Sequence, residues 1–395
     1  MLERDFQMKF LFVIQNMKVG GVQNSLLNLT SELINQNYLV DYFIIDNRGE
    51  LIEKIDSRVK TFKISKKNQK IAQVYQKSFK EILKTKKIND ILLKLFISSF
   101  KILGLKCFIT RFITRNVNID SEYDYVISFD GMPGIADEFV ANFKGKKISW
   151  VHSDVNYFNF SDKYLLKNYE RFDKISIVSK SCKNSFDKKM PLLKNRTYTV
   201  YNALNYKKIL QDSCEFNPFN DECIKFVVVS RMQNSSKRID RIIKAAFKLI
   251  ENKTTNFKIY LVGDGPSLNY YKSMVENYGI NEYIHFLGNK NNPYPYIRYA
   301  DMLVISSEFE GYPMTLKEAY LLNTPCISTD FSVAFEVINN NFDGLIVERS
   351  TEGVFKGMKY ILENEEKIKN FRINMKSKCI SNEIVIDQFI NMINE

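Results

Sequence analysis

Residues 302–329 of the chain read MLVISSEFEGYPMTLKEAYLLNTPCIST and contain the pattern that decides the fold. The apolar run Met302–Ser306 has the length of a buried strand, and it ends in a loop that carries Gly311 and Pro313. A helical pattern follows, and a second short apolar run, Pro325–Thr329, comes after it. Strands that alternate with helices pair in parallel through right-handed crossovers, so this stretch predicts one unit of a parallel α/β sheet.

The same alternation extends outward over both halves of the chain. Ile224–Ser230 is a β-branched run, and a helical pattern from Lys237 to about Ile250 follows it. The other predicted strands are Lys9–Gln15, Tyr38–Ile45, Tyr123–Phe129, Lys147–Val151, Ile175–Ser179, Phe257–Val262 and Tyr283–Leu287. Short continuous apolar strands fit sheets that helices cover on both faces. The predicted fold class is therefore α/β, with two doubly wound Rossmann-like domains that face each other across a cleft.

The length of the chain predicts more than one domain, because 395 residues exceed what one ordinary core accommodates. We predict a first domain at 1–204 and a second at 222–375. The stretch 205–221 is polar, carries Pro218 and shows no clear period, so it is the predicted linker. Residues 376–395 are predicted to form a helix that returns to the first domain. Ligands of doubly wound sheets bind beyond the carboxyl ends of the strands, which places the expected site in the cleft.

Composition and cysteine usage indicate a cytosolic globular protein. Apolar residues make up 45% and charged residues 26%. The cysteines form no C-x-x-C pair and none lies at a zinc-binding distance from a histidine, so we expect reduced thiols. They are Cys107, Cys182, Cys214, Cys223, Cys326 and Cys379. The first residues lack the basic start and cleavage site of a signal peptide, which favours a first strand there.

Two glutamates in the opening stretch are separated by seven residues. Glu310 lies in the loop after a predicted strand, and Glu318 lies about one turn into the next helix. Backbone N–H groups at the start of that helix can hold a phosphate. Glu318 would repel a phosphate, but its carboxylate can accept hydrogen bonds from vicinal hydroxyls such as those of a ribose.

A pair of cations follows the strand Ile224–Ser230. Arg231 and Lys237 are separated by five residues, and both should project from the carboxyl end of the strand. Fixed cations in this position can neutralise a departing diphosphate without a metal ion. No Asp-x-Asp lies near a strand end, so we predict no bound metal. The neighbouring Arg238 and Arg241 are interpreted as ordinary solvated cations.

Three further motifs lie at predicted strand ends. Gly20 and Gly21 follow the first strand, where glycines allow close approach to a ligand and the next helix offers its amino end to anionic oxygens. This pair is not a G-x-G-x-x-G, so it predicts no dinucleotide fingerprint. His152 ends the strand Lys147–Val151, and Gly263 opens a Gly-Asp-Gly-Pro turn. A lone histidine is usually structural, but its context here favours a ligand contact.

Together these motifs resemble the glycosyltransferases of family 4, which have the GT-B architecture and retain the anomeric configuration of the donor. The resemblance rests on the Glu310–Glu318 spacing, on the run EAYLLNTPCIST and on the strand-end motifs. It covers nearly the whole chain and is densest from Phe226 to Asp330. One departure is Arg238, where the family often has glycine. The resemblance implies a metal-independent transferase that moves a hexose or N-acetylhexosamine from a nucleotide-sugar, with UDP-sugars favoured, to a cell-surface polysaccharide such as a capsule or to a lipid-linked glycan.

The resemblance also implies roles for individual residues. Arg231 and Lys237 would stabilise the leaving diphosphate, Glu310 would position the sugar, and His152 would bond a sugar hydroxyl. Glu318 would hold the ribose, and the other donor-binding residues would be Gly20, Gly21, Gly263, Gly311, Tyr312, Pro313, Met314 and Thr315. The departing phosphate would take the acceptor's proton, so no separate base is needed. No cofactor is expected beyond the nucleotide-sugar co-substrate. The first domain would serve the acceptor and the second the donor.

Three other functions stay open from the residues alone. An inverting GT-B transferase or a sugar-nucleotide epimerase would need a base such as Asp130 or Asp154, although the spaced glutamates argue against both. A non-catalytic sugar-nucleotide binding subunit would carry the same donor motifs. A nucleic-acid binder would use the basic segment 66–115 as its main site, but this segment lacks the stacking aromatics of RNA modules, so we predict no nucleic-acid partner.

The basic segment holds nearly all the net charge of +12. Residues 66–115 carry thirteen Lys and Arg against two acids, Glu81 and Asp90, a net charge of +11. Within it, residues 91–113 read ILLKLFISSFKILGLKCFITRFI, with Lys94 and three other cations in a narrow stripe. Four charges argue against a spanning helix and fit an interfacial helix on an anionic membrane surface at the inner face of the cell membrane. The alternative is that the apolar face packs on the first domain and the lysines are merely solvated.

Overall fold

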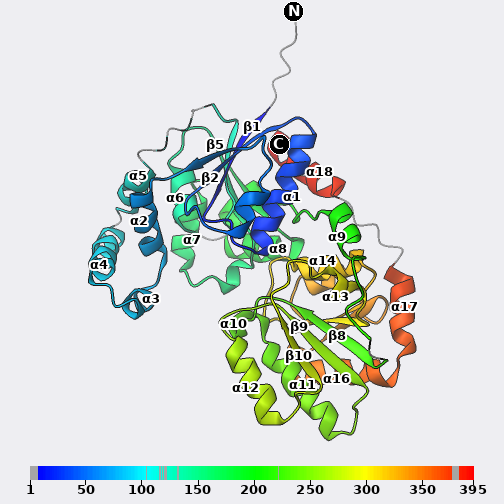
Figure 1. The fold of residues 1–395 in the computed structure, drawn as a ribbon. Helices are drawn as coiled ribbons and strands as arrows, with labels where there is room; N and C mark the ends of the chain where they lie inside the picture. Colours follow the sequence, from blue (N-terminus) through cyan, green and yellow to red (C-terminus); the bar gives the residue numbers. More distant parts are fainter. Residues whose placement is uncertain are drawn as a thin grey trace, which may run out of the picture. The chain divides into compact units, whose positions relative to one another are not determined.

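A computed structural model describes residues 8–375 and 382–395, apart from nine positions within these ranges. Those positions are Gly104, Arg115, Asn116, Asn118, Asp120, Ser121, Gly131, Met132 and Asp221. The chain forms two compact units, shown in Figure 1. The first consists of residues 1–203 together with 383–395, and the second of residues 204–382. Cys379 and the predicted start of the C-terminal helix lie outside the described residues.

The first unit is built on a parallel sheet of seven strands in the order β3-β2-β1-β4-β5-β6-β7. The strands are β1 Lys9–Ile14, β2 Leu39–Ile44, β3 Lys60–Lys63, β4 Tyr125–Ser128, β5 Lys146–Val151, β6 Lys174–Ile177 and β7 Thr197–Thr199. From Phe10 to Ile14, β1 is fully buried, because helices cover both faces of the sheet. The strand order reverses at β1, which pairs with β2 on one side and β4 on the other. Such a reversal opens a crevice beyond the carboxyl ends of the two strands.

Helices cover the first sheet, and the last helix of the chain is among them. The elements are α1 Gly21–Asn35, η1 Glu50–Lys54, α6 Ile135–Ala141, η2 Val155–Tyr157, α7 Asp162–Tyr169, α8 Lys180–Lys189, η3 Pro191–Arg196 and α18 Glu383–Asn394. The Phe389 ring of α18 lies 5.3 Å from that of Phe10 and 6.0 Å from that of Trp150, measured between centroids. The Tyr125 hydroxyl donates to the Ile393 carbonyl at 2.7 Å. The C-terminal helix is therefore part of the core of the first unit.

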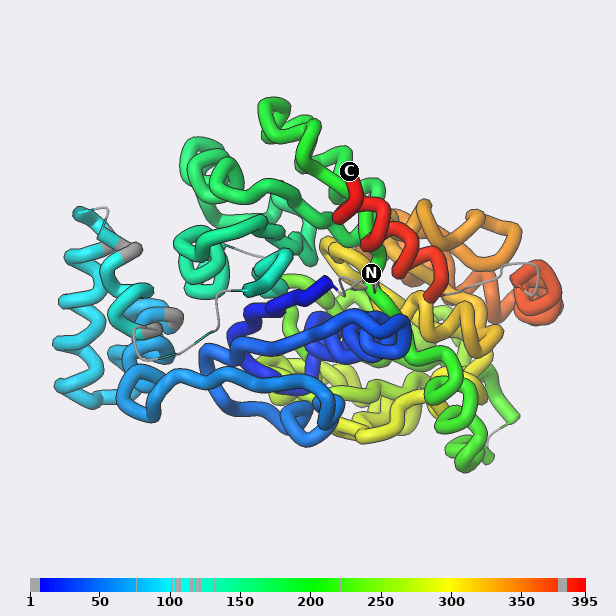
Figure 2. The backbone as a smooth tube through the Cα atoms, turned by 90° about the horizontal axis from the view of Figure 1, so that it is seen from above, coloured from blue at the N-terminus to red at the C-terminus, as the bar shows by residue number. Residues whose placement is uncertain are grey.

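Four helices between β3 and β4 form a layer at the side of the first unit, as the views in Figure 1 and Figure 2 both show. They are α2 Lys66–Gln76, α3 Phe79–Lys84, α4 Ile88–Ile102 and α5 Lys106–Thr114. α5 packs against α6, whereas α4 packs chiefly against α2, α3 and α5. α4 is therefore the outermost of the four. None of the helices in the described ranges is long and apolar enough to cross a membrane.

The assignment of Lys94 to a solvated basic stripe is wrong. Its side chain is buried, and its ammonium donates to the carbonyls of Val74 at 3.1 Å and Tyr75 at 3.2 Å, and also to that of Lys77. These carbonyls lie at and beyond the end of α2, where the last carbonyl groups lack intrahelical partners and a cation is favoured. Burial lowers the pKa of Lys94. Lys94 thus ties α4 to α2 instead of facing solvent.

The second unit is built on a parallel sheet of six strands in the order β10-β9-β8-β11-β12-β13. The strands are β8 Ile224–Val229, β9 Phe257–Val262, β10 Ile284–Gly288, β11 Met302–Ile305, β12 Cys326–Thr329 and β13 Gly344–Val347. The helices are α9 Tyr206–Asp212, α10 Asn234–Lys237, α11 Ile239–Glu251, α12 Leu268–Tyr278, α13 Tyr294–Arg298, α14 Met314–Leu321, α15 Ala334–Val337, α16 Thr351–Glu363 and α17 Glu366–Met375. The order reverses between β8 and β11, which are direct neighbours. The predicted α/β fold with parallel, doubly wound sheets is confirmed.

The segment 205–221 belongs to the second unit and opens with α9. The Asn205 side chain caps this helix by accepting from the Lys208 N–H at 3.0 Å, and Ile209 is buried. One buried aliphatic residue in a short polar helix leaves little periodicity, which is why the sequence predicts a linker here. The chain passes between the units at 203–204 and again at 382–383. There the Leu204 N–H donates to Asn382 Oδ1 at 3.0 Å, and Asn382 Nδ2 donates back to the Leu204 carbonyl at 2.5 Å.

Candidate active site

Charged residues follow both strands at the reversal point of the second sheet. Lys237 ends α10 after β8, and Glu310 lies in the loop after β11. The Lys237 ammonium donates to Glu310 Oε1 at 2.5 Å, and the Ser307 hydroxyl donates to the same oxygen at 2.6 Å. The structure thus brings together two predicted catalytic residues that are 73 positions apart in the sequence.

The loops that carry Lys237 and Glu310 are tied together behind this pair. The Ser306 hydroxyl lies 2.9 Å from the carbonyls of both Lys237 and Arg238. Arg241 donates to the Ser306 carbonyl at 3.1 Å and to Glu308 Oε2 at 2.5 Å. Only 5% of Arg241 is exposed, so its interpretation as a solvated cation is wrong. Arg238 is also engaged, because its Nε donates to Asp240 at 2.9 Å.

Arg231 occupies the first position after Ser230, on the same loop as Lys237. Its side chain is exposed. Among the residues that the structure describes, its guanidinium has no hydrogen-bond or ion-pair partner. The structure therefore does not bring Arg231 into contact with Glu310, but it leaves all five guanidinium N–H donors available to an anionic ligand.

A small pocket lies where the ends of β8 and β11 meet the start of α14. It is lined by Val228, Val229, Ser230, Lys237, Val304, Ile305, Ser306, Ser307, Glu310 and Thr315. The Ser230 hydroxyl is buried and has no hydrogen-bond partner in the described part of the chain. An unpaired buried hydroxyl costs about 1–3 kcal/mol, so we expect a polar ligand atom to pair with it. Sequence reasoning gave Ser230 no role, although it is the polar residue that closes the apolar run of β8.

The loop and helix after Glu310 hold the remaining predicted donor residues of the second unit. Gly311, Tyr312 and Pro313 are buried, and α14 begins at Met314 without a side-chain cap from any described residue. Thr315, in its first turn, lines the pocket. Open N–H groups at this helix start suit a phosphate.

Glu318 lies one turn further along α14. The side chain is partly buried, and within the described residues its carboxylate has no hydrogen-bond partner. Desolvation raises the pKa of Glu318 to about 7. A carboxylate that is desolvated and unpaired gains from hydroxyl donors in a ligand, and this agrees with the predicted contact to a ribose.

Gly263 is required by the close approach of two loops. Its φ is +135°, and a Cβ at this position would lie 2.0 Å from the Ser230 carbonyl oxygen. The Gly263 N–H donates to the Gly288 carbonyl at 2.8 Å, and the Met232 N–H donates to the Asp264 carbonyl at 2.9 Å. The turn after β9 therefore supports the loop that carries Arg231, and any side chain at position 263 would displace that loop.

In the first unit, Gly20 and Gly21 lie after β1, at the start of α1. Gly20 is the N-cap of the helix, and no side chain of the described residues caps it. Its φ of −176° is extended backbone that any residue adopts, so the glycine is not needed for its conformation. A Cβ there would meet the end of the flexible Gln23 side chain at 2.7 Å, so the main gain is space in front of the helix N–H groups.

His152 follows β5 and lies among aromatic rings. Its ring centroid is 4.7 Å from that of Phe129 and 6.3 Å from that of Trp150. Both ring nitrogens are buried without a hydrogen bond to any described residue. Desolvation lowers the pKa of His152 to about 3. The Phe129 backbone and the Asn202 side chain raise this pKa, but by less than desolvation lowers it. The imidazole is therefore neutral at physiological pH, with one donor and one acceptor to offer a sugar hydroxyl.

The two acids considered as alternative bases have different surroundings. Asp154 accepts from the Asn156 N–H at 2.9 Å and from the Ser185 hydroxyl at 3.1 Å, so both oxygens are engaged in local structure. Asp130 accepts a hydrogen bond from the Gln15 N–H at 2.9 Å. Burial raises the pKa of Asp130 to about 7, which is near the value that suits a general base.

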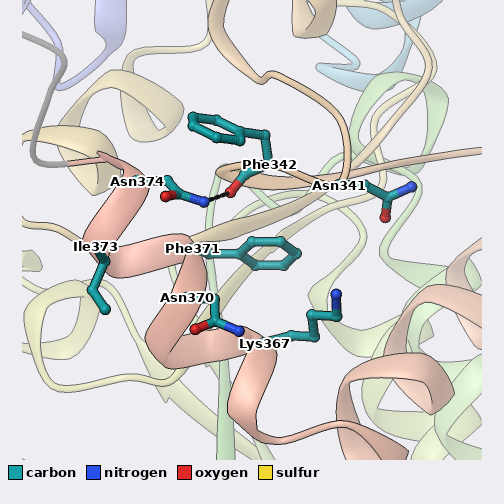
Figure 3. Close-up of a pocket in the computed structure, with 7 residues that line it drawn as sticks. All are labelled: Asn341, Phe342, Lys367, Asn370, Phe371, Ile373 and Asn374. Atoms are coloured by element: carbon teal, nitrogen blue, oxygen red, sulfur yellow. Dashed lines mark hydrogen bonds between the residues drawn. The ribbon is translucent and has the colours of Figure 1, made fainter.

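A larger hollow of the second unit lies away from these strand ends, between α17 and the loop before β13. Figure 3 shows its lining, which consists of Asn341, Phe342, Lys367, Asn370, Phe371, Ile373 and Asn374. Asn374 Nδ2 donates to the Phe342 carbonyl at 2.6 Å. This loop leads into the amino end of β13, whereas Lys237 and Glu310 lie beyond the carboxyl ends of β8 and β11. The hollow therefore lies at the opposite end of the parallel strands. It is not part of the candidate site.

Comparison with known proteins agrees with this geometry. Residues 212–378 match a family model described as Glycosyl transferases group 1. An uncharacterized glycosyltransferase of Methanocaldococcus jannaschii is 29% identical over 168 residues, which are 41% of each chain. The N-acetylgalactosamine-N,N'-diacetylbacillosaminyl-diphospho-undecaprenol 4-alpha-N-acetylgalactosaminyltransferase of Campylobacter jejuni is 24% identical over 276 residues, 68% of this chain and 73% of that protein. The match thus covers less than two thirds of the first relative and more than two thirds of the second.

A solved structure extends the likeness to nearly the whole chain. A mutant of TarM from S. aureus, crystallised with fondaparinux, α-GlcNAc-glycerol and UDP, has a TM-score of 0.72 at 14% sequence identity. The superposition covers 98% of this chain and 100% of TarM. At this identity the likeness shows the fold alone, which is the predicted two-domain GT-B fold. Within the second unit, residues 212–378 are thus similar to the group 1 glycosyl transferases.

Proposed function

We propose that the protein transfers a hexose or N-acetylhexosamine from a UDP-sugar to a cell-surface polysaccharide or a lipid-linked glycan, with retention of configuration and without a metal ion. The observation that carries this proposal is the pocket at the reversal point of the second sheet. There the Lys237–Glu310 pair surrounds one small space together with the Ser230 hydroxyl and the start of α14, which have no partner and no side-chain cap among the described residues. This set of donors suits a diphosphate joined to a sugar.

The reaction breaks the bond between the sugar C1 and the diphosphate oxygen, and forms a bond from C1 to the acceptor oxygen on the same face. The acceptor's proton passes to the departing phosphate oxygen, so the products are the glycoside and UDP. Lys237 and Arg231 neutralise charge that grows on the leaving group. Because Glu310 holds Lys237 in place before the reaction, this cation stabilises the transition state without solvent reorganisation.

The two glutamates divide the recognition of the donor. Glu310 is held by Lys237 and Ser307, which leaves its second oxygen to accept a bond from a sugar hydroxyl. Glu318 accepts bonds from the ribose hydroxyls, which replace the water that its burial has removed. In this proposal the neutral His152 bonds a sugar hydroxyl.

The comparisons support the choice of donor and acceptor. The TarM structure was solved with UDP, and the name of the Campylobacter relative states a diphospho-undecaprenol acceptor. A polyprenyl diphosphate is held in a membrane, whereas nucleotide-sugars are made in the cytosol. We therefore place the enzyme in the cytoplasm at the inner face of the membrane.

A thermal-shift screen with UDP, GDP, ADP and their sugars tests the donor, because a ligand of the native state raises Tm. UDP and its sugars should give the largest shift, and release of UDP with a glycan acceptor should follow. A shift without UDP release under any acceptor would favour a non-catalytic binding subunit. No shift with UDP would refute the donor assignment.

An inverting transferase is the second candidate, because burial raises the pKa of Asp130 and the one hydrogen bond it accepts within the described residues comes from Gln15. The anomeric configuration of the product separates the two mechanisms directly. Retention, with turnover preserved in Asp130→Asn to within a few fold, supports the retaining proposal. Inversion, with turnover lost in Asp130→Asn, would assign Asp130 as the base.

A further inference from the structure

The layer of helices α2–α5 carries an unusual share of exposed apolar surface. Of the 22 large apolar side chains that are exposed among the described residues, ten lie between Phe79 and Phe112. Four of them, Ile88, Leu92, Leu95 and Phe96, recur at the spacing of one helical face on α4, with exposed fractions from 50% to 72%. Ile102, 86% exposed, ends the same helix. Contiguous exposed apolar surface of this kind marks a contact with another protein or with a membrane.

Polar contacts on the inner side of α4 fix which face points outward. Lys94 is buried and donates to carbonyls at the end of α2. Asp90 forms an ion pair with Lys70 of α2 at 3.2 Å, and Ile97 is fully buried. Rotating α4 to hide Leu95 and Phe96 would break these contacts. The packing of α4 against its neighbours therefore fixes the outward orientation of its apolar face.

The same layer is strongly basic, and its two acids are already engaged. Glu81 accepts from the Ser78 N–H at 2.7 Å in the capping box of α3, and Asp90 pairs with Lys70. The exposed lysines around α3 are Lys77, Lys80, Lys84, Lys86 and Lys87. Within the described residues none of these five forms an ion pair. Their charge is therefore available to an anionic surface.

We infer that the outward face of α4 inserts into the headgroup region of an anionic lipid bilayer, with the lysines of α3 held against the anionic lipids. α4 has 15 residues, about 22 Å of helix, which is too short to span a bilayer but suits an interfacial position. A second copy of this chain is a poorer partner, because pairing these faces would bring the two lysine clusters together. Only the biological purpose of this lipid contact, access to a lipid-linked acceptor, rests on the proposed function.

The test is co-sedimentation of the full chain with vesicles of phosphatidylcholine alone and of phosphatidylcholine with 30% phosphatidylglycerol. The wild type should bind the anionic vesicles and should bind less as salt rises. The double variant Leu95→Asp/Phe96→Asp should lower the partition coefficient at least tenfold, with unchanged circular dichroism and unchanged turnover on a soluble acceptor. The matched control is Leu192→Asp, since Leu192 is 80% exposed on η3 of the same unit and should not affect binding. Lys80→Glu/Lys84→Glu should weaken binding and flatten its salt dependence.

Several results would overturn the inference. It fails if the wild type binds neither vesicle at low salt, or if Leu95→Asp/Phe96→Asp binds as the wild type does. It also fails if the wild type self-associates without lipid and this variant abolishes the association, because the face would then belong to a second copy. Lipid binding by a protein with no transferase activity would refute the proposed function and leave this surface assigned.

Discussion

The raised pKa of Glu318 predicts that binding of the donor depends on pH. If the carboxylate holds the ribose, only the ionised form of Glu318 binds the nucleotide-sugar well. Desolvation raises its pKa to about 7 in the free protein, so the binding form is populated above neutrality and lost below it. The chosen perturbation is Glu318→Gln, which keeps the shape of the side chain and removes its titration.

The size of the effect follows from the ionised fraction. With a pKa of about 7, this fraction is about 0.9 at pH 8 and about 0.09 at pH 6, so the apparent Kd of the wild type should rise about tenfold between them. The assay is isothermal titration calorimetry, which measures this Kd for the UDP-sugar that gives the largest thermal shift. An intact sugar diphosphate has no terminal phosphate that titrates in this range, so the protein alone supplies the pH dependence.

The Gln variant separates Glu318 from other groups that titrate near neutrality, such as Asp130. Its Kd should be nearly independent of pH and should match that of the wild type best at pH 6. Stability provides a second check, because a carboxyl whose folded pKa is raised loses stability as pH rises from its unfolded pKa to its folded one. Glu318→Gln should therefore raise Tm more at pH 8 than at pH 5. A flat wild-type Kd, or an equal slope in both proteins, would refute the ribose assignment.

Three further expectations concern the cations of the second unit. Lys237→Ala should lower turnover at least tenfold, about 1.4 kcal/mol of transition-state stabilisation, while the exposed-site control Lys272→Ala keeps wild-type kinetics. Arg241→Met should lower the free energy of unfolding by about 2–3 kcal/mol in urea titrations, less than for a fully buried pair because the Glu308 side chain is 35% exposed. Adding Glu308→Gln should restore most of that loss, and no recovery would contradict the ion-pair explanation. If Arg231 and Lys237 neutralise the diphosphate, turnover should survive excess EDTA; a loss of turnover that Mg²⁺ or Mn²⁺ restores would show that a metal does so.

The interior strands of both sheets and the edge strand β10 could be predicted from the sequence, but the other three edge strands could not. A strand buried on both faces, such as β1 or β8, is a continuous apolar run that stands out from its surroundings. β3 is only Lys60–Lys63, β7 is Thr197–Thr199 and β13 is Gly344–Val347, and each lies at the edge of its sheet. These three strands have only three or four residues, and β3 and β7 also carry polar side chains, so the long apolar run that identifies an interior strand is missing.

Buried polar side chains limited what the sequence says about the site. Arg241 and Lys94 have the residue types of a solvated surface, yet each is buried and bonded to backbone carbonyls. Their partners lie on other elements, and helical spacing alone does not reveal them. Ser230 was overlooked for the opposite reason, since its hydroxyl has no partner at all among the described residues and matters only if a ligand supplies one.

The pairing of Lys237 with Glu310 depends on which strands are neighbours. Sequence order places β9 and β10 between β8 and β11, and a simple meander would keep the two residues apart. Instead β9 and β10 lie on one side of β8 while β11 joins its other side, so the loops after β8 and β11 leave the sheet next to each other. Motif spacing indicates which residue types the chemistry needs, but the reversal of strand order is what puts a cation from one motif 2.5 Å from a carboxylate of the other.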